Sequence, residues 1–242
     1  CFLQIVSDRM NHNEFFLNDS NYNAEALQAL QSDEIVGRTD NGIFITHDIY
    51  EEWGANRIIE KEWNRRSDIR TFFCSIGSSY VVRHTFRQWL VDKFNGNPFQ
   101  ESQEILDVVF DSLISPIWRD EIIVSILLSS YSETFFIQSE EQLLKNDTRM
   151  FTRVAYLLLI ACKRITRVVQ VQGYDYPLYA PEGPGWKDMI RFIYTHQDET
   201  QKCPYKVRIL KEWCQYNQKG ETTRYAGLIV LNMMEAIEND SH

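Results

Sequence analysis

Apolar residues recur at helical spacing along most of the chain, and this pattern predicts a mainly α-helical protein. Ala26, Leu27 and Leu30 form one apolar face, which predicts a helix over 24–30, and a first helix is expected over about 1–10. The same periodicity predicts further helices over 48–66, 68–75, 78–94, 101–115, 117–130, 132–145, 147–165, 185–196, 203–217 and 222–238.

The pattern changes between residues 35 and 46, where two short apolar stretches flank Asp40-Asn41-Gly42. Asn and Gly tolerate the positive φ of a tight turn, so we predict a β-hairpin there. The side-chain oxygen of Thr46 or of Asp48 is then expected to cap the helix that follows. A helix followed by a two-stranded wing is the typical end of a winged-helix module, and we assign residues 1–50 to such a module.

Residues 51–242 are predicted to form an α-helical repeat region, a HEAT-like solenoid. Pro116–Ile122 and Pro184–Ile190 share the pattern P-x-W-[KR]-D-x-I at an offset of 184 − 116 = 68 positions, which fits two helix-pair repeats. In each copy the proline is expected to begin a helix and the tryptophan to pack inward. The interval 168–185, rich in proline, glycine and tyrosine, is expected to be the one substantial loop.

Composition narrows the cellular setting and the partners. The formal net charge of −9 repels nucleic acid and anionic membranes, and the longest apolar run, Val154–Cys162, is too short to span a bilayer. The five cysteines are scattered without a CxxC pair, and Cys74 and Cys162 are expected to be buried thiols. We therefore expect a cytoplasmic protein, and the start within an apolar pattern suggests a segment of a longer chain.

No catalytic or metal-binding pattern is found in the sequence. There is no P-loop, nucleophile elbow, HExxH or GxGxxG, and the five histidines are isolated from one another. DNA reading is disfavoured because the candidate recognition helix, residues 23–34, has three acids and no lysine or arginine. This segment is expected to be neither an enzyme nor a nucleic-acid binder.

A basic cluster follows the predicted hairpin. Because Glu60 and Glu62 are interleaved with it, an exposed helix face with ion pairs is the favoured interpretation, and pairing with a neighbouring domain or a nucleotide is the alternative. The cluster comprises Arg57, Lys61, Arg65, Arg66, Arg70, Arg83 and Arg87.

His47 is the one candidate binding residue. A single histidine is more often structural than functional, but His47 lies where a strand meets a helix N-terminus, which favours anions. The adjacent Asp48 is a carboxylate that can fix the imidazole tautomer. These features suit contact with a phosphate group.

The stretch Ile43–Trp53, with Thr46-His47-Asp48 inside it, resembles the end of the winged-helix domain in STAND-class P-loop NTPases, the NACHT and NB-ARC type of signalling ATPases. In that family a methionine-histidine-aspartate motif closes the domain, and threonine replaces the methionine here. The helical stretch Ser75–Leu90 resembles the region after the ATPase in bacterial STAND proteins of antiphage defence. The motif resemblance covers about residues 40–90.

The resemblance implies a regulatory or sensor segment of a nucleotide-dependent switch. His47 would contact the β-phosphate of ADP, and the P-loop that binds ADP or ATP with Mg would lie upstream of residue 1. The partners implied are that ATPase domain, a protein trigger bound by the helical repeats, and further copies of the parent protein in an oligomer. The alternative is a self-standing helical scaffold that binds a protein through a groove lined by Trp118, Trp186 and Trp213.

Overall fold

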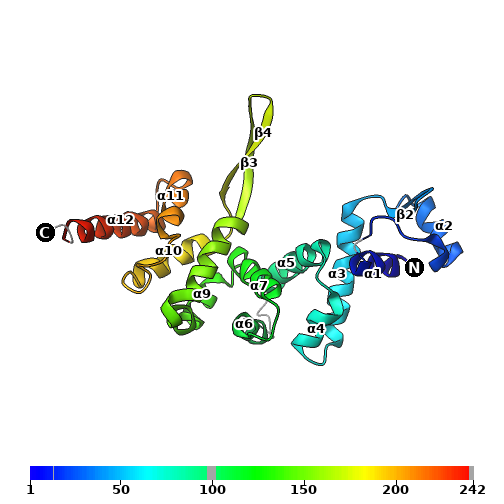
Figure 1. Ribbon diagram of the computed structural model, residues 1–242, viewed down its shortest axis with the longest axis horizontal. Helices are drawn as coiled ribbons and strands as arrows, with labels where there is room; N and C mark the ends of the chain where they lie inside the picture. Colours follow the sequence, from blue (N-terminus) through cyan, green and yellow to red (C-terminus); the bar gives the residue numbers. More distant parts are fainter. Residues whose placement is uncertain (13, 97–101, 240–242) are drawn as a thin grey trace. The chain divides into compact units, whose positions relative to one another are not determined.

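The protein is mainly α-helical, as predicted, with two small antiparallel β-hairpins (Figure 1). This computed structural model describes residues 1–12, 14–96 and 102–239, with side chains described up to residue 235. The chain clusters into two compact units, one formed by Cys1–Leu90 and Asp111–Glu121, the other by Val91–Phe110 and Ile122–His242. The domain boundary predicted at residue 50 falls inside a helix and stays a prediction.

The first 45 residues hold two helices, a 3₁₀ turn and a two-stranded hairpin, which we call the wing. The elements are α1 (Phe2–His12), a 3₁₀ turn (Asp19–Asn21), α2 (Ala24–Ser32), β1 (Val36–Thr39) and β2 (Gly42–Ile45). Leu17 forms a bridge to Ile43, with two backbone hydrogen bonds of 2.9 Å, which ties the segment after α1 to the wing. The helices expected near 1–10 and 24–30 and the hairpin at 35–46 are confirmed.

Local chemistry explains where these elements begin and turn. The Asn23 side chain accepts a hydrogen bond of 2.9 Å from Ala26 N–H and so caps α2. At the wing turn Gly42 has φ +124°, and a Cβ there would lie 2.4 Å from Leu17 O. Only glycine fits this backbone beside its neighbour.

The long helix α3 (Asp48–Arg65) packs against α1 through a glycine. A Cβ on Gly54 would lie 2.6 Å from Cγ2 of the fully buried Val6, and 3.2 Å from Phe2. The two helices are therefore in close contact at this point, and the side chain of Val6 occupies the space that a larger residue would need.

Exchanging Gly54 for alanine should lower the free energy of unfolding of the first unit by up to about 2 kcal/mol. Overpacking costs about 1–3 kcal/mol, and the helix propensity of alanine returns about 1 kcal/mol. Gly227→Ala is the matched control, since Gly227 is an exposed helical position with nothing within 4 Å of its Cβ. That variant should gain up to about 1 kcal/mol. Urea denaturation measures both, and equal gains in the two variants would contradict the packing argument.

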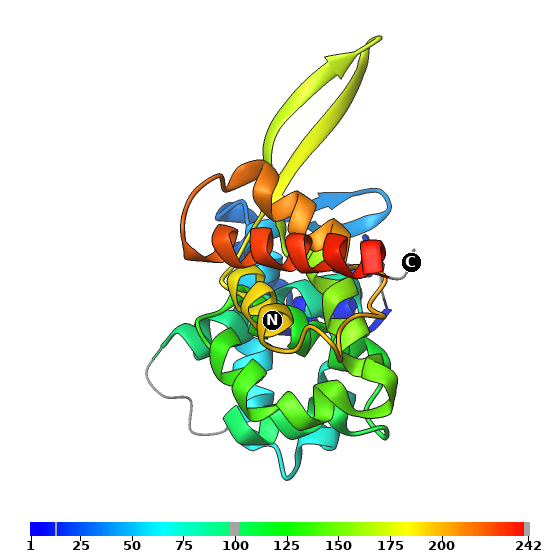
Figure 2. The ribbon, with the colours of Figure 1, turned by 90° about the vertical axis from the view of Figure 1, so that its left-hand side faces the viewer.

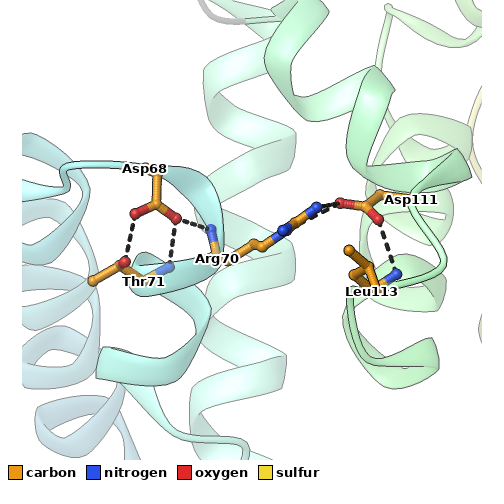
Figure 3. A network of polar contacts seen from close by, with 5 residues as sticks. All are labelled: Asp68, Arg70, Thr71, Asp111 and Leu113. Carbon is orange, nitrogen blue, oxygen red and sulfur yellow. Dashed lines mark hydrogen bonds and ion pairs between the residues drawn. The ribbon is translucent and has the colours of Figure 1, made fainter.

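Helices α4 (Ile69–Ile76) and α5 (Tyr80–Asn95) follow in the first unit, and α5 continues into the second. Asp68 caps α4, accepting hydrogen bonds from Arg70 N–H, Thr71 N–H and the Thr71 hydroxyl (Figure 3). The Thr71 hydroxyl bond is the main reason that the pKa of Asp68 falls to about 2. Asp68 is therefore ionised at neutral pH, when its carboxylate holds the first turn of α4.

The segment that precedes helix α7 (Pro116–Leu128) is joined to α4 by an ion pair in the same network (Figure 3). The Arg70 guanidinium lies 2.9 Å from Asp111, whose other carboxylate oxygen accepts the Leu113 N–H at 2.8 Å. That backbone bond, followed by Arg70, lowers the pKa of Asp111. Arg83 and Arg87 both pair with Glu121, so three cations of the predicted basic cluster are engaged in ion pairs, but with acids of other segments and not along one exposed helix face.

The rest of the chain is a series of helices interrupted by one hairpin. The helices are α6 (Ser102–Phe110), α7 (Pro116–Leu128), α8 (Ser132–Gln138), α9 (Glu140–Ala161), α10 (Gly185–Thr195), α11 (Lys206–Tyr216) and α12 (Glu221–Asn239). The break predicted near residue 146 is a kink within α9, where residues 145–148 leave the helical conformation. The helix predicted over 101–115 ends early, at Phe110, and residue 101 lies outside the described residues.

The interval 168–185, predicted as a loop, is mostly a second hairpin, and that prediction was wrong. Strand β3 (Lys163–Val171) pairs with β4 (Tyr174–Pro181) around a two-residue turn. Gln172 and Gly173 have φ of 52° and 82°, which a type I′ hairpin turn requires. The helix predicted over 147–165 consequently ends at Ala161, because the β-branched residues of β3 favour extended backbone.

The repeated P-x-W motif begins a helix in both copies, as predicted. Pro116 is the first residue of α7, and Pro184 is the N-cap residue of α10. Trp118 and Trp186 are buried, and so is Trp213. The prediction that these three tryptophans line a groove, suggested for the scaffold alternative, was therefore wrong, because their rings are part of the core. Cys162 is buried as predicted, whereas Cys74 is exposed, so that prediction was wrong too.

Candidate functional site

His47 lies at the junction of the wing and α3, and its backbone position is held by the preceding residue. The Thr46 N–H donates to Ile35 O at 3.1 Å, and its hydroxyl contacts the carbonyls of Glu34 and Ile35. Thr46 thus closes the base of the hairpin. His47 itself is the N-cap residue of α3, without a side-chain capping bond, and Asp48 is already helical. The predicted cap by Thr46 or Asp48 was wrong, since the hydroxyl of Thr46 is used by the hairpin.

The His47 side chain is exposed beside the first turn of α3. The Tyr50 ring is its one ring neighbour among the described residues, with centroids 5.9 Å apart. The backbone carbonyl of His47 accepts the Tyr50 N–H at 3.0 Å, so the helix begins directly behind the imidazole. An imidazole and the N–H groups of a helix N-terminus both favour an anion, and here they lie at the same place.

Two acids in the first turn of α3 differ in how they affect the electrostatic potential at this helix N-terminus. Asp48 is exposed next to His47, whereas Glu51 is buried and paired with Arg9 of α1. Arg9 donates from Nε and Nη2 to the two carboxylate oxygens of Glu51, at 2.8 and 3.0 Å. Its third bond, from Nη1, goes to Phe15 O at 2.8 Å. This bidentate pair neutralises Glu51 and anchors the start of α3 to α1.

In the first unit, α3 and α5 border a shallow cleft of about 260 Å³. Ile49 and Trp53, one helical turn apart, line it and are 69% and 53% exposed. Tyr80, 71% exposed, stacks on His84 at the α5 side. These side chains leave apolar surface exposed on the first unit. Ile49 and Trp53 lie on α3, whose N-cap residue is His47.

A second cleft, of about 210 Å³, lies among α8, α9 and α10 in the second unit. Asp188 lines it, and burial raises the pKa of this carboxyl group. The other charges are largely paired, Arg191 with Glu133 and His196, 3.7 Å away, with Glu140. The cleft thus combines acids and a histidine with the hydroxyl group of Thr195.

Other site types are not found in the part of the chain that the structure describes. No three His, Cys, Asp or Glu side chains gather there in a way that could hold a metal ion. None of the described helices is long and apolar enough to cross a membrane. Neither a scan against protein-family models nor a search of curated proteins finds a match for this chain.

The sequence therefore located the imidazole and its helix, but missed two features around it. The Arg9–Glu51 pair joins residues far apart in sequence, and no local sequence pattern predicts such a contact. The exposed row Ile49 and Trp53 has the i, i+4 spacing of an ordinary core face, so only burial distinguishes the two cases.

Proposed function

We propose that this chain is the winged-helix and helical-array part of a STAND-type signalling NTPase, working in the cytoplasm as a regulatory segment without its own catalytic centre. In this proposal a P-loop domain elsewhere in the same polypeptide binds ADP or ATP with Mg. His47 contacts the β-phosphate of ADP and so favours the resting state.

The observation that carries the proposal is the exposed imidazole of His47 at the N-terminus of α3, held in place by the Thr46 hydrogen bonds. A protonated or N–H-donating imidazole bonded to a phosphate oxygen contributes about 1.5–3 kcal/mol. This bias shifts a two-state equilibrium roughly ten- to hundredfold. It supports a resting state but needs further domain contacts to set it.

The exposed side chains of Ile49, Trp53 and Tyr80 supply such contacts in the proposal. A nucleotide-binding domain seated on this surface would bring the phosphates close to His47, since both lie at the start of α3. Nucleotide exchange would then dock the nucleotide-binding domain on this surface or release it. The helical array would bind the protein trigger.

The test is His47→Ala in the intact parent protein. Bound ADP should dissociate about ten- to hundredfold faster, and basal signalling should rise, because one phosphate contact of the resting state is lost. His12→Ala is the matched control, since His12 is an exposed histidine of the same module. Nucleotide retention is measured by release of a fluorescent ADP analogue. ADP affinity unchanged by His47→Ala would contradict the role.

The second candidate is a helical scaffold for protein–protein interaction. The exposed apolar hairpin β3–β4 favours it, because such a surface in water suits a protein partner. In that case His47→Ala would change neither nucleotide binding nor stability.

A further inference from the structure

The hairpin β3–β4 extends beyond the helices of its own unit (Figures 1 and 2). Six of its apolar side chains are 48–70% exposed: Ile165, Val168, Val171, Tyr174, Tyr176 and Tyr179. An isolated two-stranded ribbon is only marginally stable in water. A ribbon that keeps this much apolar surface exposed is suited to a further strand or a covering partner.

The register separates the charges of the hairpin onto two faces. Val171 faces Tyr174, Arg167 faces Leu178, and Arg164 faces Ala180, so the two arginines share one face with Tyr174 and Tyr176. The bulge between residues 165 and 167 keeps Arg164 on that face. Asp175 lies opposite Gln170 on the other face. One face of the hairpin is therefore aromatic and cationic, without an acid.

The two arginines are available for a ligand. Lys163 at the base of the hairpin is paired with Glu212 of α11. Arg164 and Arg167 are exposed and form no ion pair with any residue that the structure describes.

The two edges of the hairpin differ in what they offer a further strand. The residues that flank a two-residue turn form a hydrogen-bonded pair, and such pairs alternate along an antiparallel ladder. The pair Val168 and Pro177 is consequently a non-bonded one, so the backbone groups of both residues face outward. On β4 the outward-facing residue of this pair is Pro177, which has no N–H to donate. Pro181 also lacks an N–H, so the β4 edge cannot pair fully with a further strand. The β3 edge presents Val168 and Gln170 without any proline.

No described strand pairs with the β3 edge. We propose that it binds an extended acidic segment of a partner protein as a third strand. Its backbone would bond to Val168 and Gln170, and carboxylates at alternate positions would lie beside Arg164 and Arg167. Apolar residues between them would cover the exposed valines and tyrosines.

Charge and backbone chemistry favour this occupant over others. A second copy of the chain paired through β3 would bring the Lys163, Arg164 and Arg167 of both strands together, with no acid in either strand. Nucleic acid would use the arginines but not the open backbone edge, and the net charge of −9 repels it. The proposal does not depend on the role of His47, which belongs to the other unit.

The test uses the full chain and two fluorescent pools of extended peptides, each about eight residues long. One pool carries glutamate at alternate positions, the other lysine, and both have mixed Val, Ile, Thr and Tyr between them. Fluorescence anisotropy should show binding of the glutamate pool only, weakening as salt is raised. Binding of both pools alike, or of neither, overturns the proposal.

Two variants test separately how much the backbone edge and the arginine charges contribute to peptide binding. Val168→Pro removes an outward N–H of β3 and should weaken binding at least about tenfold, as should Arg164→Ser with Arg167→Ser. Arg224→Ser, an exposed arginine on α12, is the control for net charge and should change binding less than about twofold. Amide exchange of the hairpin verifies that each variant keeps β3–β4 paired.

Three further measurements cover the other occupants. Preferential binding of single-stranded DNA over the glutamate pool, binding to anionic lipid vesicles that Arg164→Ser with Arg167→Ser abolishes, or a concentration-dependent mass that Val168→Pro abolishes would each overturn the acidic-strand proposal.

Discussion

Replacing Glu51 with alanine will lower the free energy of unfolding of the first unit by about 3–5 kcal/mol, because Arg9 then remains in the interior without its counterion. The Arg9 and Glu51 side chains are only 11% and 9% exposed, and two hydrogen bonds join them. Removing one partner of such a pair leaves an uncompensated charge. Among the described residues, the bond from Arg9 to Phe15 O is then the one hydrogen bond left to the guanidinium.

Chemical denaturation followed by tryptophan fluorescence measures this loss. Glu52→Ala is the matched control, since Glu52 is the next residue of α3, and its side chain is 50% exposed. It should change stability by at most about 1 kcal/mol. The double variant Arg9→Met with Glu51→Leu should recover most of the loss, because apolar residues of similar size can replace a buried pair. A Glu51→Ala protein as stable as Glu52→Ala would show that the pair is not desolvated.

The pair also gives a way to separate stability from the proposed function. Glu51 lies one helical turn from His47, so its loss should disturb the position of the imidazole along with the fold. His47 is exposed and without a capping bond, so His47→Ala should leave the unfolding free energy within about 0.5 kcal/mol. A loss of ADP retention in His47→Ala at unchanged stability would then be a ligand effect.

Local signals in the sequence were enough for the first hairpin and its flanking helices. Asp40-Asn41-Gly42 places the turn, and Gly42 adopts the positive φ beside Leu17 that its position demands. The helix that starts at residue 48 was likewise correct. The capping prediction failed for a tertiary reason, because the Thr46 hydroxyl bonds to the strand opposite and not to the helix.

The second hairpin was missed because both of its faces are exposed. Without one buried face, the alternation of apolar and polar positions that reveals a strand is lost, and the prolines of β4 resembled loop markers. Gln172-Gly173 is a weaker turn signal than Asn41-Gly42, although both central residues take positive φ. Cys74 was misplaced because its neighbours Phe72, Phe73 and Ile76 are apolar and buried, whereas Cys74 itself lies on the exposed side of α4.

The buried tryptophan of the second P-x-W motif should carry the largest single contribution to the core of the second unit. Trp186 is completely buried, and its indole N–H donates to Cys162 O at 2.7 Å. It thereby joins the start of α10 to the point where α9 ends and β3 begins. We expect Trp186→Ala to lower the free energy of unfolding by about 3–5 kcal/mol, from lost burial and the cavity that remains.

Trp186→Phe divides this loss into its parts and keeps the prediction testable if the alanine variant does not fold. Phenylalanine retains most of the apolar contact but cannot donate, and Cys162 O keeps its bond of 3.0 Å from Glu182 N–H. The expected cost is therefore about 1–3 kcal/mol, set mainly by the volume lost. Trp53→Phe on α3, where the indole is 53% exposed, should cost less than about 0.5 kcal/mol. Equal costs at the two positions, in urea denaturation, would contradict a core role for Trp186 and with it the view that the repeated motif anchors each helix by its tryptophan.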